Sequence, residues 1–369
     1  MKSKLQTKIL LALTCDKMIE YIIRMVKQIN LSKIFRFRQH YLISTPFYGL
    51  NFTAKQQKNG TTILSDVQFF VNGFLKENAS LDTTTIKNLK GNKKLIHIIA
   101  PSSLFLYKTN LENKQRTQGV KALTPLLKDC FNIDLSQNKV GALDAETGKE
   151  IQETTALLPE NICILGARKE ELHQIQTDLV TNQFVPQKLH FSVLHVPQGL
   201  ASYQAIIHSN SPILFLDFSM QKSCIYIVGN GQILAAYPPT HGLKNLLTLG
   251  RKALNLQDDV TTLQYLTKQI ANNMEGQKTL LSRMVSDVKS YINFFEIQAN
   301  VSIDGIFVNG LMNEFSWIET YLANALEMQT FAINYQAWLN TENIVLPQDV
   351  QIPQKALFSM INAIIHYRQ

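Results

Sequence analysis

The chain has 369 residues, of which 45% are hydrophobic and 17% are charged. That length allows about two domains, and the composition is that of a folded protein rather than a disordered one. No apolar run approaches the ~20 residues that a membrane-spanning helix needs. The net charge is +8, but residues 1–40 hold nine basic and two acidic residues, so the rest of the chain is nearly neutral. This distribution disfavours a basic body that coats nucleic acid, and we expect no nucleic-acid partner.

The cysteines and histidines show no pattern that carries chemistry. Cysteine occurs four times, at Cys15, Cys130, Cys163 and Cys224, without a CxxC pair, and no histidine lies at metal-ligand spacing. Isolated thiols in a chain of this size are typical of reduced cytoplasmic proteins. We therefore predict neither a structural disulfide nor a zinc site.

Residues 1–40 are predicted to form a basic amino-terminal arm. From Asp16 onward, apolar residues recur at helical spacing and predict an amphipathic helix: Ile19, Ile22, Ile23, Val26 and Ile29. A basic amphipathic helix can lie on an anionic membrane surface, and residues 1–36 are the candidate contact. The alternative is a helix that packs on the body with its lysines in solvent, and both remain open. The apolar stretch 9–13 is too short for a secretory signal.

The first half of the body is expected to mix short strands with helices. It begins with a β-hairpin, whose strands 48–56 and 61–71 are joined by the tight-turn dipeptide Asn59-Gly60. Further strands are predicted at 95–101, 104–107, 140–143, 161–167 and 189–195. Helices are predicted at 83–89, 118–131 and 169–182, where the apolar residues follow helical spacing.

The second half is expected to open with a meander of three strands, at 212–218, 223–228 and 232–237. Helices are predicted at 243–254, 258–272, 279–298, 313–326 and 356–367. Two more strands are predicted at 303–308 and 328–333. Each half thus contains a β-hairpin followed by further strands and helices, which is the layout of a duplicated fold.

The most specific resemblance lies around Asp217. The segment 213–227 resembles the phosphate hairpin of actin-like proteins, in which an apolar strand runs into Asp-x-Gly and a Thr precedes the second strand. Gly242 resembles the glycine that opens a helix after the third strand, and segment 303–311 resembles the adenosine-binding strand and turn, with Gly310 in the turn. The fold class implied is α/β, with mixed α+β sheets. The form implied is the two-domain actin-like fold, in which a ribonuclease H-like unit is duplicated.

Among actin-like proteins the chain is most similar to the PilM type, with FtsA and the cytoplasmic part of GspL as relatives. The similarity rests on residues 93–168, which resemble the strand-helix-strand-strand subdomain that this branch inserts into its first domain. The domains implied are residues 41–212 and 213–350, with residues 351–369 forming a carboxyl-terminal helix that returns to the first.

The resemblance also implies a nucleotide site in which several family residues are replaced. The implied cofactor-binding residues are Asn51, Thr53, Asp217, Ser219, Ser223, Gly242 and Gly310, with Asp217 as the Mg²⁺ ligand. Ser219 stands where the family has a glycine, which would let backbone N–H groups approach a phosphate. Asn51 aligns with the aspartate of the first hairpin but lacks its charge. We therefore expect a degenerate site without catalytic residues and leave binding of ATP with Mg²⁺ open.

Each of these residues also has a purely structural interpretation. Asp217 fits a carboxylate that caps a backbone group at a turn. Gly310 fits a plain turn glycine, and Asn51 fits an ordinary strand residue. The sequence leaves these alternatives open beside the nucleotide site.

The function implied is that of a cytoplasmic scaffold, peripheral on the inner membrane, in a type IV pilus or type II secretion platform. The implied partner is the cytoplasmic tail of a single-pass platform protein of the PilN type, with a traffic ATPase as a second partner. Strands 95–107 and helix 118–131 would border the groove that grips this tail. Two alternatives remain: an active ATPase of the same fold, and an FtsA-like filament-forming protein at the membrane.

Overall fold

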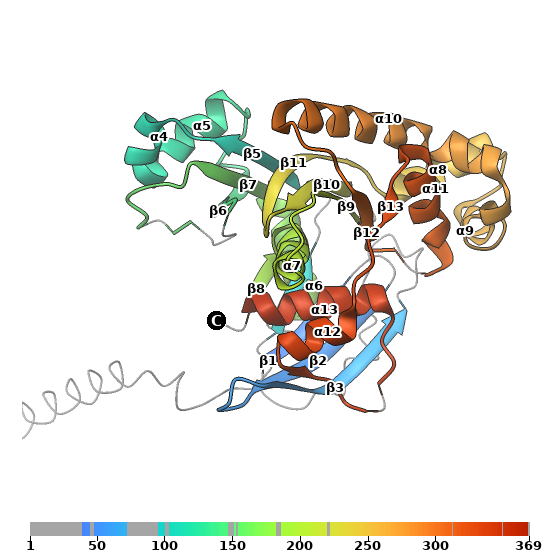
Figure 1. Cartoon of the computed structure of the whole chain (residues 1–369), viewed down its shortest axis with the longest axis horizontal. Helices are drawn as coiled ribbons and strands as arrows, with labels where there is room; N and C mark the ends of the chain where they lie inside the picture. The colour runs from blue at the N-terminus through green and yellow to red at the C-terminus, as the bar shows by residue number, and fades with distance from the viewer. Residues whose placement is uncertain are drawn as a thin grey trace, which may run out of the picture.

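The computed structural model describes residues 39–44, 48–71, 95–99, 103–146, 151–152, 154–181, 186–219, 222–311, 313–348 and 350–367. Within these ranges the strands form three sheets, of six, five and three strands (Figure 1). No helix in the described ranges is long and apolar enough to cross a membrane. The predicted amphipathic helix of the arm and the helix predicted at 83–89 lie outside the described residues.

The first sheet has the strand order β14-β3-β2-β1-β4-β8. Its strands are β1 (Gln39–Ser44), β2 (Tyr48–Gln56), β3 (Thr62–Val71), β4 (Leu95–Ile99), β8 (Pro186–Phe191) and β14 (Ile344–Val345). The first three form an antiparallel meander, and β4 and β8 continue it in parallel beside β1. The hairpin predicted around the Asn-Gly turn is confirmed.

The second sheet repeats this order as β11-β10-β9-β12-β13. Its strands are β9 (Ile213–Phe218), β10 (Lys222–Gly229), β11 (Gln232–His241), β12 (Gly305–Asn309) and β13 (Gln329–Thr330). Here too an antiparallel meander is followed by parallel strands beside its first member. The duplication expected from the sequence is confirmed, and it makes β9 the counterpart of β1 and β12 the counterpart of β4.

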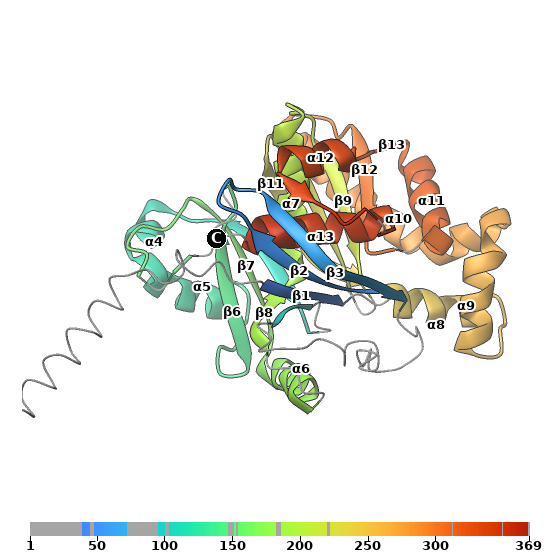
Figure 2. The ribbon, with the colours of Figure 1, turned by 90° about the horizontal axis from the view of Figure 1, so that it is seen from below.

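The helices α7 (Ser192–Ile206) and α13 (Gln354–Tyr367) lie between these two sheets, beside the short α12 (Tyr335–Thr341). α13 packs against α7 and β2, and α7 packs against all three strands of the second meander. Figure 2 shows α13 running across the strands of the first sheet. Apolar side chains from both sheets and from these helices form one core, which includes Phe52, Phe215 and Phe358.

The other face of the second sheet is covered by α8 (Leu243–Ala253), α9 (Asp259–Lys268), α10 (Met274–Ala299) and α11 (Ser316–Leu326). Alternation along β9 turns Leu214 and Leu216 to this face, opposite Phe215. Side-chain caps define where the helices begin. The Asp258 carboxylate accepts the Thr261 N–H at 2.7 Å, and the Asn273 carbonyl oxygen accepts the Gly276 N–H at 2.9 Å.

The third sheet has the order β5-β7-β6 and a core of its own. The chain passes through β5 (Phe105–Asn110), α4 (Asn113–Thr117), a 3₁₀ turn (Gly119–Ala122), α5 (Leu123–Asp129), β6 (Asn138–Asp144) and β7 (Asn161–Arg168). This is the order of strand, helix, strand and strand that the resemblance implies. α6 (Lys169–Thr181) then leads back to the first sheet.

The structure corrects three local predictions. The strand predicted at 189–195 ends at Phe191, and His195 belongs to α7. Pro197 inside that helix misled the prediction, because proline opposes helix interiors unless tertiary packing overrides it. The strand predicted at 328–333 contracts to β13, while α12 and β14 were not predicted because they are too short to show a period.

Candidate functional site

The carboxyl ends of β9 and β12 lie side by side in the second sheet. Their parallel register pairs Asp217 with Asn309, and the Asn309 amide donates a hydrogen bond to the Asp217 carboxylate at 2.8 Å. Carboxyl ends of parallel strands are where ligands bind in open α/β sheets. Among the residues predicted from sequence, Asp217 therefore occupies the position best suited to a ligand.

Asp217 is a buried carboxylate with little to stabilise its charge. Its side chain and backbone are only 8% exposed, and desolvation raises its pKa to about 6, against a smaller lowering by the Asn309 hydrogen bond. Cys224 lies opposite it on β10, and burial together with the Asp217 charge raises the pKa of that thiol. The same two causes contribute to the raised pKa of Tyr48. These neighbours carry no compensating positive charge.

Gly310 follows β12 and lies against the end of β9. Its φ is +81°, and a Cβ at this position would collide with the Phe218 carbonyl oxygen. The glycine therefore lets the two strand ends approach each other. This contact explains why position 310 is a glycine without invoking a ligand.

Ser219 closes the turn between β9 and β10. Its hydroxyl donates to the Lys222 carbonyl at 2.5 Å, and its N–H donates to the same carbonyl at 3.0 Å. In return the Lys222 N–H donates to the Ser219 hydroxyl at 3.2 Å. Both of these N–H groups are thus used inside the turn.

Gly242 and Ser223 lie next to this turn. Gly242 precedes α8, and the first N–H of that helix, from Leu243, donates to the Ser219 carbonyl at 3.1 Å. Ser223 is fully buried on β10, and its hydroxyl has no hydrogen-bond partner within the described part of the chain. The structure therefore brings Asp217, Ser219, Ser223, Gly242 and Gly310 together around one turn.

Asn51 and Thr53 lie apart from the turn to which the sequence assigned them. Both are buried in the middle of β2, where they pair with Leu42 and His40 of β1. β1 ends at Ser44 and β2 begins at Tyr48, so Asn51 lies inside β2 and its alignment with a hairpin aspartate is wrong. Because β9 is the counterpart of β1, the residue equivalent to Asp217 is Ile43, one before the strand end.

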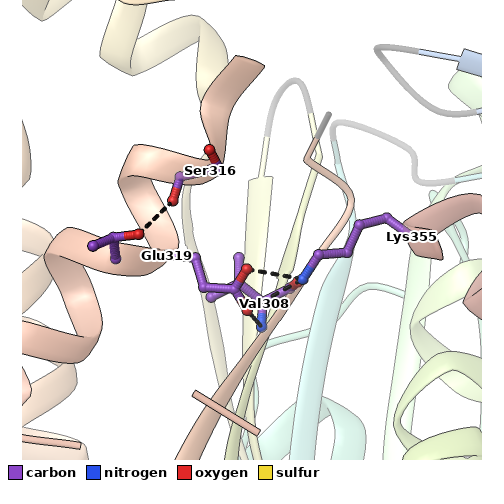
Figure 3. Close-up of polar contacts among 5 residues, drawn as sticks. Val308, Ser316, Glu319 and Lys355 are labelled. Atoms are coloured by element: carbon purple, nitrogen blue, oxygen red, sulfur yellow. Dashed lines mark hydrogen bonds and ion pairs between the residues drawn. The ribbon is translucent and has the colours of Figure 1, made fainter. Parts of the chain in front are cut away.

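Three residues in this region were missed in the sequence analysis, which are Tyr48, Glu319 and Lys355. The Tyr48 hydroxyl lies 3.1 Å from the Ser359 hydroxyl and donates to the Lys355 carbonyl at 3.3 Å. The Lys355 ammonium forms an ion pair with Glu319 at 3.0 Å and also donates to the Val308 carbonyl (Figure 3). No motif marks these residues, because the pairs are separated by 36 to 311 positions in sequence.

The described residues of this turn offer few groups to a nucleotide with Mg²⁺. No group of three or more His, Cys, Asp or Glu side chains in the described ranges could hold a metal ion. The N–H groups of Ser219, Lys222 and Leu243, which a phosphate would need, all donate to atoms of this turn. The chemistry visible here is that of a closed strand junction around one buried acid.

Comparison with known proteins identifies the fold. No family model and no curated protein matches the chain. A chain of a PilM–PilN type IV pilus biogenesis complex matches with a TM-score of 0.64 and 12% identity, over 89% of this chain and 96% of its own length.

Two other solved structures match with lower scores. A protein of Bacteroides thetaiotaomicron with an actin-like ATPase fold and unknown function has a TM-score of 0.42 and 9% identity, over 89% of this chain and 96% of its own. The cytoplasmic domain of EpsL, from the type II secretion system of Vibrio cholerae, has a TM-score of 0.38 and 8% identity, over 89% and 95%. These two scores are too low to carry an argument. With the first match and the duplicated sheet order, the chain has a mixed α/β actin-like ATPase fold of the PilM form.

Proposed function

We propose that the protein is a scaffold of a bacterial pilus or secretion platform, placed in the cytoplasm and peripheral on the inner membrane. The observation that carries the proposal is the match to a chain of the PilM–PilN complex, which extends over 89% of this chain and 96% of that one. A match at 12% identity shows the fold alone, so the scaffold role is inferred from that fold together with the closed junction at Asp217.

The partner proposed is the cytoplasmic segment of a single-pass membrane protein similar to PilN. Of the two expected borders of the groove, residues 95–107 contain β4 of the first sheet and the start of β5 of the third, and residues 118–131 contain α5, which follows β5. A segment bound there would contact both parts of the first half. An extended peptide can pair its backbone with a strand edge while side chains enter pockets.

In this proposal the nucleotide site is degenerate. Asp217 is satisfied by Asn309, and the turn that would hold phosphates is closed by Ser219. A scaffold needs a fixed surface rather than turnover, and such a junction supplies it without a cofactor.

The proposal is tested by peptide binding to the full chain. The labelled cytoplasmic segment of a PilN-type single-pass membrane protein is titrated with the protein, and fluorescence anisotropy is measured. We expect saturable binding with a dissociation constant on the order of micromolar. A scrambled peptide of the same composition is the control. Equal binding of both peptides, or binding of neither, would contradict the scaffold role.

A second experiment tests the proposed membrane contact of residues 1–36. The full chain and a chain beginning at residue 37 are sedimented with vesicles that contain anionic lipid. We expect only the full chain to sediment with the vesicles. Added salt should weaken its binding, because salt screens the contacts of lysine and arginine with anionic headgroups. Equal sedimentation of the two chains would show that the arm does not contribute to membrane binding.

A further inference from the structure

The outer edge of β12 is only partly covered by a neighbouring strand. β13 pairs with Gly305 and Ile306, and the Phe331 N–H continues the ladder to the Ile306 carbonyl at 2.7 Å. Backbone groups of alternate residues point to the same side of a strand, so Val308 faces this edge next. Within the described residues no strand pairs with Val308 on this side, so its N–H and carbonyl need other partners.

A lysine and a glutamate supply these partners. The Glu319 carboxylate of α11 accepts the Val308 N–H at 3.3 Å, and the Lys355 ammonium of α13 donates to the Val308 carbonyl. Figure 3 shows the two side chains meeting at Val308 from opposite sides. Together the two side chains make the hydrogen bonds to Val308 that one residue of a neighbouring strand would otherwise make.

The pair is partly buried and held on several sides. The Lys355 ammonium lies 3.0 and 3.2 Å from the two Glu319 carboxylate oxygens and 4.7 Å from the centre of the Phe307 ring. The two side chains are 22% and 19% exposed. Burial lowers the pKa of Lys355, and Glu319 opposes that change. Charged hydrogen bonds in such surroundings are stronger than those at an open surface.

The opposite edge of the same sheet has a comparable contact. Lys108, on β5 of the third sheet, donates to the Leu234 carbonyl of β11 at 2.5 Å and to the Ile233 carbonyl at 3.3 Å. Each edge of the second sheet is therefore held by a lysine from another part of the fold. One comes from the helix between the sheets and the other from the third sheet.

We propose that Lys355 with Glu319, and Lys108, are clamps that fix the second sheet against α13 and against the third sheet without a bound ligand. Apolar packing is not directional, so the shared core holds the sheets together but does not fix their edges. A hydrogen bond from a lysine to one particular carbonyl is directional and therefore fixes the position of a sheet edge. The clamp at Val308 lies one residue from Asn309, so it also holds the strand end that contacts Asp217.

Hydrogen exchange of the full chain, followed by mass spectrometry, tests this proposal. Lys355→Met keeps much of the side-chain length but removes the charge and the donor. We expect exchange in segment 305–311 to become about 10-fold faster, while segment 232–241 is unchanged. Lys108→Met should show the reverse pattern. Arg251→Met is the matched control, because its ion pair with Asp259 is exposed and joins two helices rather than a sheet edge, and it should change neither segment.

Two further variants separate the clamp from a loss of folding. Glu319→Gln keeps an acceptor for the Val308 N–H and should accelerate segment 305–311 less than Lys355→Met does. The reciprocal exchange of charges, Lys355→Glu with Glu319→Lys, keeps an ion pair but sets a donor against the Val308 N–H and an acceptor against its carbonyl, so exchange at 305–311 should stay fast. Unchanged exchange at 305–311 in Lys355→Met, uniform acceleration along the whole chain, or a return to the unmodified rate in the double variant would overturn the proposal.

Discussion

At the scale of single residues, the junction between β9 and β12 depends on side chains that the sequence shows only in part. Asp217 and Gly310 were predicted because they stand at strand ends within recognisable patterns. Asn309 was not predicted, although its amide is the hydrogen-bond donor to the Asp217 carboxylate. A strand asparagine has no distinguishing spacing, and its role follows only from the parallel register of two strands 92 positions apart.

Replacing Gly310 by alanine tests the close approach of the strand ends. The new Cβ would meet the Phe218 carbonyl in a left-handed backbone conformation, so we expect the free energy of unfolding to fall by about 2–3 kcal/mol. Gly60→Ala is the control, because Gly60 has a φ of +88° but open space around it. It should cost only about 1 kcal/mol. Equal losses in urea titrations of the two variants would show that the contact with Phe218 is unimportant.

Asp217 makes stability depend on pH in a direction that can be derived. Its pKa is about 6 in the folded chain, above the ordinary 3.8, so the folded state binds the proton more tightly. The stabilisation by protonation is complete below the ordinary pKa and is lost as the pH rises through about 6. Asp217→Asn removes this loss. We expect the variant to be more stable than the unmodified chain at neutral pH by about 2–3 kcal/mol, with the gap closing near pH 4.

Denaturation measured across this pH range checks the prediction, with the exposed Asp304→Asn as the control. The control should follow the unmodified chain. If Asp217→Asn followed it as well, Asp217 would not be a desolvated acid in the folded state.

At the scale of elements, the sequence predicted what is local and missed what is set by packing. The hairpin of the first sheet and the meander of the second were predicted because alternating apolar residues and tight turns lie next to each other in the chain. α7 was predicted in part as a strand because Pro197 and Gly199 oppose helices, and only its position between two sheets explains the helix. The turn between β1 and β2 was misplaced because β1 was not recognised as a strand.

Gly199→Ala tests the contact that sets the spacing of α7 and α13. A Cβ at Gly199 would occupy the space filled by the Asn362 amide, so that side chain or α13 would have to move. Overpacking of this kind costs about 1–3 kcal/mol, and we expect a loss in that range in urea denaturation. Gly141→Ala, on β6 with no atom near the new Cβ, is the matched control and should have a small effect. A small effect at both positions would contradict the tight helix contact.

At the scale of the whole molecule, the fold follows from a duplication that the sequence revealed and the sheet order confirms. The site could not be derived to the same extent. Tyr48, Glu319 and Lys355 come from three distant segments, and their contacts depend on how α13 lies between the sheets. The structure is that of an actin-like fold in which Asn309 donates a hydrogen bond to the buried Asp217 carboxylate, and we propose that its surfaces serve a partner.

The measurement that tests this account most directly is a calorimetric titration of the full chain with the partner's cytoplasmic segment, with and without saturating Mg-ATP. We predict that the segment binds with the same affinity and enthalpy in both, because the donors at the Ser219 turn are used internally and the sheets are fixed without a ligand. Binding that requires Mg-ATP, or that Mg-ATP changes by 10-fold (about 1.4 kcal/mol) or more, would contradict it. The protein would then be a nucleotide-controlled switch.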